Sequence, residues 1–434
     1  MHLVSIVAAT AGLLFGFDIA VINGALIFLR EQFLWSDFQT EIAVGSLLLG
    51  CAIGASAAGW LSDRFGRRRI LMLAAVLFAA SSLATALPRN LGEFSAARLA
   101  AGSATGIASM VAPLYISENS PRHIRGRLVT FNQMAIVSGI LLAYIVNWSL
   151  AGIGPSAWRW MFAAAAVPAT ALGIALLFVP ESPRWLIRQQ RYDEARRVLR
   201  SLGASGEFDE IRETVAAEQG SLRQLLQPGL RKPLVIAVML AFLQQVTGVN
   251  TVLYYGSIIF REHVGERSVA AAIGVNVVIG IVNFLATIVA IWIIDRVGRK
   301  PLLLASSGGM AASLIVLGLA FTMTPPPAMV VLGVMLAYVA SFGIGMGPGV
   351  WVVMSELFPT SIRGRAMSIA TITLWLSSLL LTATFLSLVS ALGASGAFWI
   401  YAALSAFTFV FVWRVTPETR GKSLEEIEKM WRRA

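Results

Sequence analysis

Two ionisable side chains, Asp18 and Arg98, interrupt long apolar segments of this 434-residue chain. If lipid surrounds those segments, each charge costs about 2.5–3.5 kcal/mol on the most lenient insertion scale, and such a residue marks a functional site by default. Burial raises the pKa of a carboxylic acid, whereas a nearby guanidinium lowers it. An aspartate that loses and regains an arginine would therefore take up and release a proton. The alternative is a permanent structural ion pair.

Neutral amides and aromatic rings form a second group of candidates, most of them in the second half of the chain. Amides donate and accept hydrogen bonds and rings offer flat apolar faces, which suits an uncharged ligand rich in hydroxyl groups. A lone amide in an apolar segment usually joins helices, but the adjacent Gln244 and Gln245 favour ligand binding. The candidates are Gln133, Gln244, Gln245, Asn250, Tyr254, Asn283, Trp351 and Trp375.

The composition restricts the elements that can hold these residues. Charged residues make up 13% and hydrophobic residues 57% of the chain, and the mean hydropathy is +0.75. A soluble chain carries about 25% charged residues, so a soluble enzyme, a disordered chain and a coiled coil are excluded. The single cysteine, Cys51, excludes a disulfide framework and a zinc cluster. We expect no metal, no cofactor and no enzyme activity, because no nucleophile lies near a base.

Long apolar runs predict transmembrane helices, which need about 20 residues to cross the bilayer core. We therefore predict an all-α membrane protein with twelve such helices, at 3–29, 39–61, 70–87, 92–116, 126–150, 158–179, 233–260, 269–294, 301–323, 328–356, 365–391 and 394–413. The polar stretch 180–232 separates a first bundle, 1–179, from a second, 233–413, and 414–434 is a tail. Its mixture of charges and periodic apolar residues predicts short amphipathic helices.

Lysine and arginine predict the orientation, because they gather on the cytoplasmic side. The loops after even-numbered helices hold 28 of these 34 residues, and the opposite loops hold five. Both termini and the 180–232 stretch should therefore face the cytoplasm. Asp18 and Arg98 then lie at one depth, about 9–14 Å from the outer surface at 1.5 Å per residue, so they can pair. Contact with anionic lipid explains the net charge of +11, without nucleic acid.

The two bundles repeat each other. The segment Asp63-Arg64-Phe65-Gly66-Arg67-Arg68 returns in the second bundle as Asp295-Arg296-Val297-Gly298-Arg299-Lys300. Two further motifs, one beginning at Pro121 and one at Pro180, return in the same order and at nearly the same spacing. Two parallel six-helix repeats are the plan of a major facilitator transporter, in which one half rocks against the other around a site near the midplane.

The repeated motifs place carboxylates beside guanidinium groups at the predicted cytoplasmic ends of the helices, where bidentate pairs can form. Such pairs would lock the halves together on the inside while the transporter faces outward. The alternative is that the arginines only set topology and contact headgroups, which does not explain acids at matching points of both halves. The predicted latch residues are Asp63, Arg64, Arg67, Arg68, Glu118, Arg125, Glu181, Arg184, Asp295, Arg296, Arg299, Glu356, Arg363, Glu418 and Arg420.

Over nearly its whole length, the sequence resembles the sugar porter family of the major facilitator superfamily. The motifs that carry the resemblance are the repeated loop segments, Gly12-Leu13-Leu14-Phe15-Gly16-Phe17-Asp18, Pro180-Glu181-Ser182-Pro183-Arg184-Trp185, Gln244-Gln245 with Gly248-Val249-Asn250, and Pro417-Glu418-Thr419-Arg420-Gly421. The resemblance implies that the amide and aromatic candidates, with Phe15 and Gly347, contact the sugar or cover it. It also implies proton symport, because facilitative relatives carry a neutral residue at the position of Asp18.

Two residues depart from the polar pattern of some members of that family. Ile140 stands where certain proton-linked porters have glutamine, although hexose carriers of the family also use isoleucine there. Leu374 replaces an amide that is common in the family. The loss of a partner for a hydroxyl group leaves the class of ligand unchanged but leaves open which sugar is bound.

We predict that the protein is a bacterial monomer in the inner membrane and imports a hexose or pentose with a proton by alternating access. The expected partners are the monosaccharide, the proton and the lipid bilayer. An uncoupled uniporter and a proton-coupled transporter of a polyol such as inositol are the alternatives. The shortness of the tail after Arg414 argues against a sugar sensor that does not transport. The amide cluster argues against a drug exporter, which would need an apolar cavity.

Overall fold

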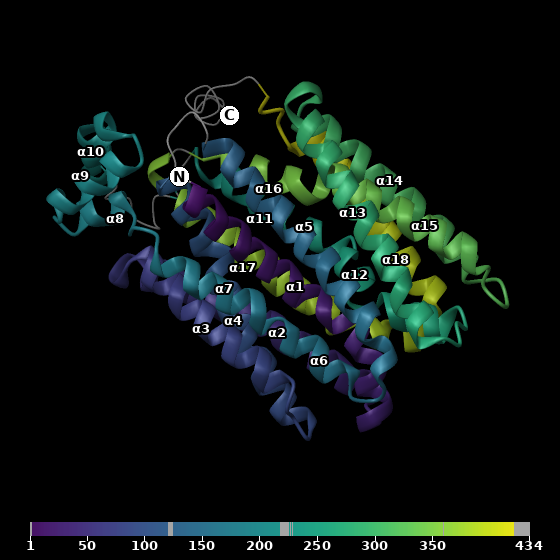
Figure 1. Cartoon of the computed structure of the whole chain (residues 1–434). Coiled ribbons are helices and arrows are strands. Elements are labelled where there is room, and N and C mark those ends of the chain that lie inside the picture. Colours follow the sequence, from purple (N-terminus) through teal and green to yellow (C-terminus); the bar gives the residue numbers. More distant parts are fainter. Residues whose placement is uncertain are drawn as a thin grey trace.

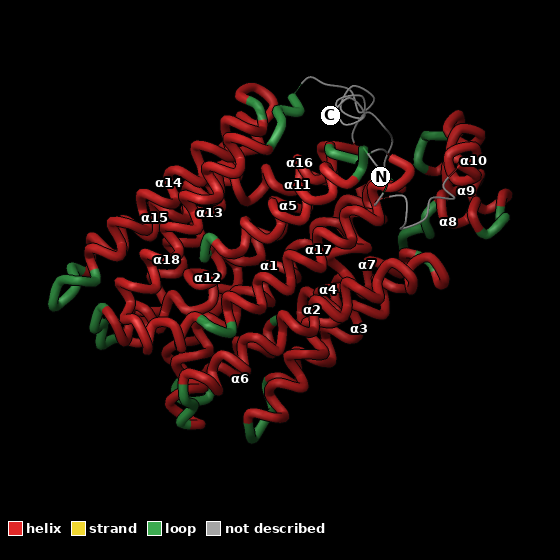
Figure 2. Tube along the Cα trace, turned by 180° about the vertical axis from the view of Figure 1, so that it is seen from behind, coloured by secondary structure: helices red, strands yellow, loops and turns green. Residues whose placement is uncertain are grey.

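The computed structural model describes residues 2–119, 125–217, 225, 227, 229–358 and 360–420. These residues form helices and loops without strands (Figure 2), and twelve of the helical spans are long and apolar enough to cross a membrane. The prediction of an all-α membrane protein with twelve spans is confirmed. Figure 1 shows the spans as one elongated bundle, with a small group of shorter helices at one end.

Each predicted half forms six spans. The first half contains α1 (His2–Phe33), α2 (Asp37–Phe65), α3 (Arg67–Thr85), α4 (Leu91–Glu118), α5 (Arg125–Leu150), and the broken span α6 (Ala157–Ala164) with α7 (Ala166–Leu177). The linker contains α8 (Pro183–Arg188), α9 (Tyr192–Ser201) and α10 (Phe208–Ala217). The second half contains α11 (Arg231–Val246), α12 (Val249–Ile258), α13 (Val269–Val297), α14 (Arg299–Ala320), α15 (Ala328–Ser341), α16 (Gly347–Glu356), α17 (Thr360–Thr382) and α18 (Phe385–Val415).

The helices of the first half pack closely enough to hold α1 in a fixed register. A Cβ added at Gly16 of α1 would lie 1.8 Å from the carbonyl oxygen of Ile136 on α5, so only glycine permits this approach. The helices α2 and α4 meet in the same way, since a Cβ at Gly102 would lie 1.9 Å from the carbonyl oxygen of Leu47. This packing holds α1, which carries Asp18, against α5, and it holds α4, which carries Arg98, against α2.

Two spans of the second half are interrupted near their middle. Gly248 separates α11 from α12 with a φ of +93°, a left-handed conformation that costs glycine little. A π-helical segment, η5 (Phe342–Met346), separates α15 from α16, and single π-helical turns are frequent at functional sites. A second π-helical segment, η4 (Ile259–His263), ends the span that contains α12. The sequence around η5 is rich in glycine, with Gly343, Gly345, Gly347 and Gly349.

The boundary between the last two spans lies where the sequence predicted it. Within α18, Gly393 leaves the helical conformation with a φ of +71°. The rings of Phe385 and Tyr401, one on each side of Gly393, pack with their centres 6.2 Å apart, so the chain reverses its direction at this point. The structure adds an interruption that the sequence did not predict, because α17 ends at Thr382 and α18 begins at Phe385. The carboxylate of Glu41 on α2 accepts the Ser387 N–H in the first turn of α18.

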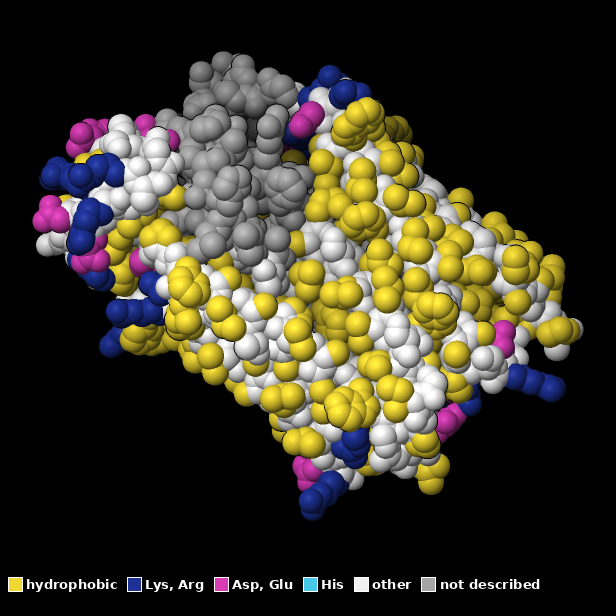
Figure 3. Space-filling model, viewed as in Figure 1, with side chains coloured by type: hydrophobic (Ala, Val, Ile, Leu, Met, Phe, Trp, Pro, Cys, Tyr) yellow, Lys and Arg dark blue, Asp and Glu magenta, His cyan; other side chains and the backbone are white. Residues whose placement is uncertain are grey.

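Charge and apolar surface divide the molecule into a band and two ends. The beginning of α1, the end of α18 and the helices α8–α10 lie at the same end of the bundle (Figure 1), which we call the linker end. Apolar side chains cover most of the bundle's length, and the visible charged side chains gather at its two ends (Figure 3). This arrangement suits a bundle whose middle faces hydrocarbon.

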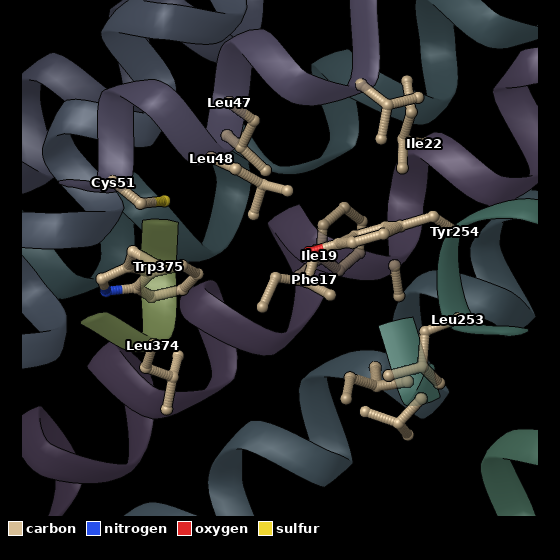
Figure 4. Close-up of a cluster of buried hydrophobic side chains, with 14 of the residues drawn as sticks. Phe17, Ile19, Ile22, Leu47, Leu48, Cys51, Leu253, Tyr254, Leu374 and Trp375 are labelled. Carbon is tan, nitrogen blue, oxygen red and sulfur yellow. The ribbon is translucent and has the colours of Figure 1, made fainter. Parts of the chain in front are cut away.

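The two halves meet mainly along α1 with α12, α2 with α17, and α5 with α13. Much of the apolar core lies on these surfaces, including side chains of α1, α2, α12 and α17 (Figure 4). Phe17 of α1, Leu47 of α2 and Tyr254 of α12 are each 1% exposed or less. Tyr254, one of the candidate residues, therefore lies on a surface that the two halves share.

Candidate functional site

Asp18 of α1 and Arg98 of α4 form a buried ion pair. The Nη1 of Arg98 donates to Asp18 Oδ1 at 2.5 Å, and its Nη2 donates to the backbone oxygen of Asp18 at 3.2 Å. The hydroxyl of Thr105 donates to the other carboxylate oxygen at 3.0 Å. The two charged residues are only 3% and 1% exposed. The structure thus brings together the two charges whose pairing the sequence predicted.

The guanidinium of this pair lies against an aromatic ring and has one nitrogen without a hydrogen-bond partner. The guanidinium lies 5.2 Å from the centre of the Phe162 ring, and the Nε of Arg98 is buried without a hydrogen-bond partner. Breaking a buried pair leaves an uncompensated charge, which is costly. The sequence analysis missed Thr105, although its position two helical turns after Arg98 puts it on the same face of α4.

Four side chains of the second half form a continuous chain of hydrogen bonds. Gln244 Nε2 donates to the carbonyl oxygens of Met346 and Gly347 at 2.7 and 3.1 Å. Gln245 Nε2 donates to Gln244 Oε1 at 3.3 Å, and Asn250 Nδ2 donates to Gln245 Oε1 at 2.6 Å.

The chain ends on α17, at a residue that the sequence analysis missed. Asn250 Nδ2 also lies 2.7 Å from the hydroxyl of Ser378, which is fully buried. Ser378 lies one helical turn after Leu374, the apolar residue that stands in place of a family amide. α17 therefore supplies a polar group to the amide chain, although Leu374 replaces the amide that is common in the family.

Aromatic candidates from both halves meet beside this chain. The rings of Phe15 on α1 and Trp375 on α17 pack edge to face with their centres 5.4 Å apart. The Trp375 Nε1–H and the Tyr254 hydroxyl are buried without a partner, and Figure 4 shows both side chains among apolar neighbours. Buried polar atoms are normally hydrogen-bonded, so these two groups are available to a ligand or to another conformation.

The remaining candidates lie on three further helices. Gln133 on α5 and Trp351 on α16 are partly buried, and Asn283 on α13 is 4% exposed. Asn283 is next to the interrupted tenth span, since a Cβ at Gly343 would lie 3.2 Å from its amide oxygen. Among the described contacts, none joins these three side chains to the amide chain.

The first set of predicted latch residues is connected within the first half. Arg67 Nε donates to Glu118 Oε2 at 3.0 Å, and its Nη1 lies 3.1 Å from Asp63. Glu181 accepts the backbone N–H of Arg68 at 3.0 Å, at the start of α3. Arg64 stacks on two aromatic rings of its own helix. Arg184 lies at the start of α8.

The second set repeats this pattern in the second half. Arg299 Nη2 donates to Glu356 at 3.0 Å, and its Nη1 lies 3.0 Å from Asp295. Glu418 accepts the backbone N–H of Arg299 and of Lys300, at the start of α14, at 3.1 and 3.0 Å.

The remaining members of this set complete the pattern. Arg296 stacks on Trp292, and the Arg420 N–H donates to Glu418. The predicted latch residues Arg125 and Arg363 have side chains outside the described part of the structure. The described pairs each hold one half together, whereas the sequence analysis had expected pairs that cross between the halves.

A pH-dependent contribution of Glu418 to stability is expected from its surroundings. Partial burial raises the pKa of this carboxyl. Hydrogen bonds from backbone N–H groups together lower it by a larger amount, so the pKa lies below its ordinary value; the donors are those of Arg420, Arg299, Lys300 and Thr419. A carboxyl whose pKa is lowered in the folded state stabilises the protein at pH values above the ordinary pKa of that group. This contribution is lost as the pH falls through the lowered pKa.

We expect Glu418→Gln to lower the stability of the purified protein in detergent by about 0.3–1 kcal/mol at neutral pH, the usual effect of a carboxylate at a helix N-terminus. Thermal unfolding followed from pH 7 down to pH 3 should show the wild type losing this advantage in the acidic part of that range. Glu213→Gln, an exposed change on α10, is the matched control. A Glu418→Gln deficit that stays constant over the whole range would contradict the assignment to the carboxylate charge.

The described hydrogen bonds and ion pairs that join the two halves lie toward the end opposite the linker. Asn23 of α1 donates to the Leu253 carbonyl at 2.7 Å and accepts the Ser257 N–H at 3.0 Å. The Tyr144 hydroxyl donates to the same carbonyl at 3.0 Å. The Ser387 hydroxyl of α18 donates to Glu41 at 2.6 Å. The sequence analysis missed these residues, since single polar groups near the ends of spans carry no periodic signal.

Comparison with known proteins agrees with this architecture. A family model described as "Sugar (and other) transporter" matches residues 4–431. The chain is 38% identical over 440 residues to the arabinose-proton symporter of Bacillus subtilis, covering 99% of this chain and 94% of that protein. It is 37% identical over 471 residues to the D-xylose-proton symporter of Escherichia coli, covering 99% and 95%.

Solved structures are similar over the full length. A partially occluded, inward-open conformation of the xylose transporter from E. coli superposes with a TM-score of 0.87 at 35% identity, covering 97% of this chain and 99% of that one. Another structure of that transporter, a proton:xylose symporter bound to 6-bromo-6-deoxy-D-glucose, gives a TM-score of 0.85 at 36% identity, covering 99% and 98%.

Proposed function

Because this chain belongs to the sugar transporter family of the major facilitator superfamily, we propose that it imports a monosaccharide together with a proton by alternating access. The observation that carries the proposal is the buried pair of Asp18 and Arg98, which no apolar packing requirement explains. The relatives named as proton symporters for arabinose and xylose support the same conclusion.

The orientation that we propose places the linker end in the cytoplasm, with both termini and α8–α10 on that side. The bias of lysine and arginine toward this end supports it. The two bundles, 1–179 and 233–413, act as the two rocking units, 180–232 is the linker and 414–434 the tail. A single chain holds a complete set of candidate groups, so we propose a monomer in a bacterial inner membrane.

Proton coupling follows from the geometry of the pair. Asp18 loses the two hydrogen bonds from Arg98 and Thr105 whenever α1 moves away from α4. A carboxylate that loses a guanidinium in an apolar environment binds a proton more readily, because both the lost charge and the desolvation favour its neutral form. The proton would enter with the sugar and leave when the pair forms again.

Sugar recognition uses the chain of amides from Gln244 to Asn250, with the rings of Phe15 and Trp375 against one face of the sugar. Neutral amides suit hydroxyl groups, each of which donates and accepts. In the described arrangement these amides satisfy one another, so a bound sugar would replace amide–amide contacts with amide–hydroxyl contacts. The free Trp375 Nε1–H and the Tyr254 hydroxyl supply two further donors. Gln133, Asn283, Gly347 and Trp351 complete the proposed site.

The test is to add single sugars to cells expressing the protein in a weakly buffered medium and to record the external pH. We expect a substrate to make the medium more alkaline, because each sugar that enters removes a proton from it. Unlabelled arabinose, xylose, galactose, glucose and inositol should then compete against one labelled sugar to identify the substrate. Sugar entry with no pH change would favour the uncoupled uniporter, and competition by inositol alone would favour a polyol transporter.

A further inference from the structure

Two arginine–glutamate pairs face each other across the two halves at the end opposite the linker. Arg30 Nη1 lies 3.3 Å from Glu262 Oε1. Arg261 Nη2 pairs in turn with Glu31 Oε1. Arg30 and Glu31 are in the last turn of α1, and Arg261 and Glu262 are in the π-helical segment η4. Each two-residue segment therefore offers one charge of each sign and receives the opposite charge from its partner.

The two segments occupy equivalent places in the internal repeat. Arg30-Glu31 returns as Arg261-Glu262, at almost the same spacing along the chain as that between Asp63 and Asp295. In a two-fold symmetric contact, residue i of one unit meets residue j of the other, and j meets i. The four residues meet this condition between the two halves of one chain.

A polar layer lies directly below these charges, toward the site. The hydroxyl of Ser257 donates to the backbone oxygen of Asn23 at 2.5 Å, and Asn23 donates to Asn276 Oδ1 at 3.2 Å. These residues are 1% exposed or less. The four charged side chains are partly exposed, between 19% and 55%, so water can compete for them when the halves separate. The charges thus cap a dry contact that holds α12 against α1.

We infer that Arg30-Glu31 and Arg261-Glu262 form a reciprocal outer latch, which closes the external mouth while the transporter is open toward the cytoplasm. This inference rests on the alternating access proposed above. The described pairs at the linker end each stay within one half, whereas the outer pairs cross between the halves. The outer pairs must therefore break each time the protein opens outward, and their strength sets the balance between the two states.

The experiment measures the width of the outer mouth in variants of one pair. Glu31 and Arg261 are chosen because Arg30 has a second partner, Asp37, at 2.8 Å. Spin labels at Leu87→Cys and Met323→Cys, exposed positions in loops of opposite halves, report the distance across the mouth in a Cys51→Ala background. Glu31→Arg and Arg261→Glu should each raise the ratio of open to closed molecules about two- to fivefold, the range for partly exposed pairs.

Three controls decide the interpretation. The double variant Glu31→Arg with Arg261→Glu restores opposite charges and should return the ratio to that of the wild type. Arg267→Glu makes the same charge change at an exposed neighbour and should leave the ratio unchanged. Raising the salt concentration should move the ratio of open to closed molecules of the wild type toward that of the single variants, since salt screens charges at the surface.

The possible failures can be told apart. In one outcome, the distance in the wild type changes between sugar-free and sugar-bound samples while every variant gives the same distances as the wild type. That result would contradict the latch and leave alternating access standing. The same effect from Arg267→Glu, or no rescue in the double variant, would also overturn the latch. A wild-type distance that never changes with sugar or pH would contradict the proposed transport cycle itself.

Discussion

Asp18→Asn should retain exchange of sugar across the membrane and lose accumulation against a gradient. The asparagine is close in shape to aspartate: its amide oxygen can still accept from Arg98, and its amide NH2 can donate to the Thr105 hydroxyl. It cannot bind and release a proton at neutral pH. Sugar movement would then be uncoupled from the proton gradient.

The size of this effect can be stated in advance. With one proton for each sugar, a difference of one pH unit across the membrane supports an accumulation of about tenfold, since a factor of ten corresponds to about 1.4 kcal/mol. With the Asp18→Asn variant, the sugar concentration inside the proteoliposomes should rise only until it equals the concentration outside. Labelled sugar uptake into proteoliposomes with an imposed pH gradient measures the accumulation, and counterflow without a gradient measures the exchange.

Glu213→Gln, which neutralises an exposed carboxylate on α10, is the matched control and should accumulate sugar like the wild type. Equal accumulation by Asp18→Asn would refute the role of this aspartate in coupling. Loss of both exchange and accumulation would show that the buried pair is needed for the transport movement itself.

Asn250→Ala should weaken sugar binding by roughly 10- to 100-fold. The change removes an amide that we place against the sugar, and it leaves Gln245 Oε1 and the Ser378 hydroxyl without their described partner. An unsatisfied buried polar group costs about 1–3 kcal/mol. The effect should appear as a higher KM for sugar uptake, and as weaker binding to purified protein measured by calorimetry.

Two further variants separate binding from folding. Asn119→Ala removes the buried asparagine that follows α4 and donates to the carbonyl oxygen of Tyr115 at 3.0 Å, and it should leave the KM unchanged. Ser378→Ala removes the last hydroxyl of the chain while Gln245 still holds Asn250, so a smaller rise in KM is expected. If Asn250→Ala binds sugar as the wild type does, the amide chain is structural and the site lies elsewhere.

The parts of the fold that the sequence predicted are those with a strong local or repeated signal. Uninterrupted apolar segments predicted the twelve spans, and the isolated charges Asp18 and Arg98 predicted their own pairing, because a charge in lipid needs a partner. The repeated loop motifs predicted two clusters of carboxylates and arginines at one end. The clusters are present, but the described pairs of Arg67 and Arg299 stay within their own halves.

The parts that the sequence did not predict depend on contacts between distant segments. No local pattern shows that Glu41 of α2 meets the first turn of α18, and this contact accompanies an interruption between Thr382 and Phe385 that the sequence did not predict. Ser378 gave no signal of its own, because a buried serine in a span usually bonds to its own helix. Arg30 and Arg261 were counted only as loop charges, since their significance depends on the glutamate that follows each of them.

The two hydrogen bonds that Gln244 donates to Met346 and Gly347 have a consequence for the evolution of substrate choice. One side chain serves both the ligand surface and the weakest point of a moving helix, so a mutation at Gln244 would alter selectivity and turnover together. Adaptation to a new sugar is then easier at positions that face the ligand but form no hydrogen bond to the interrupted tenth span. Leu374, an apolar neighbour of the amide chain, can acquire a polar group without disturbing the tenth span.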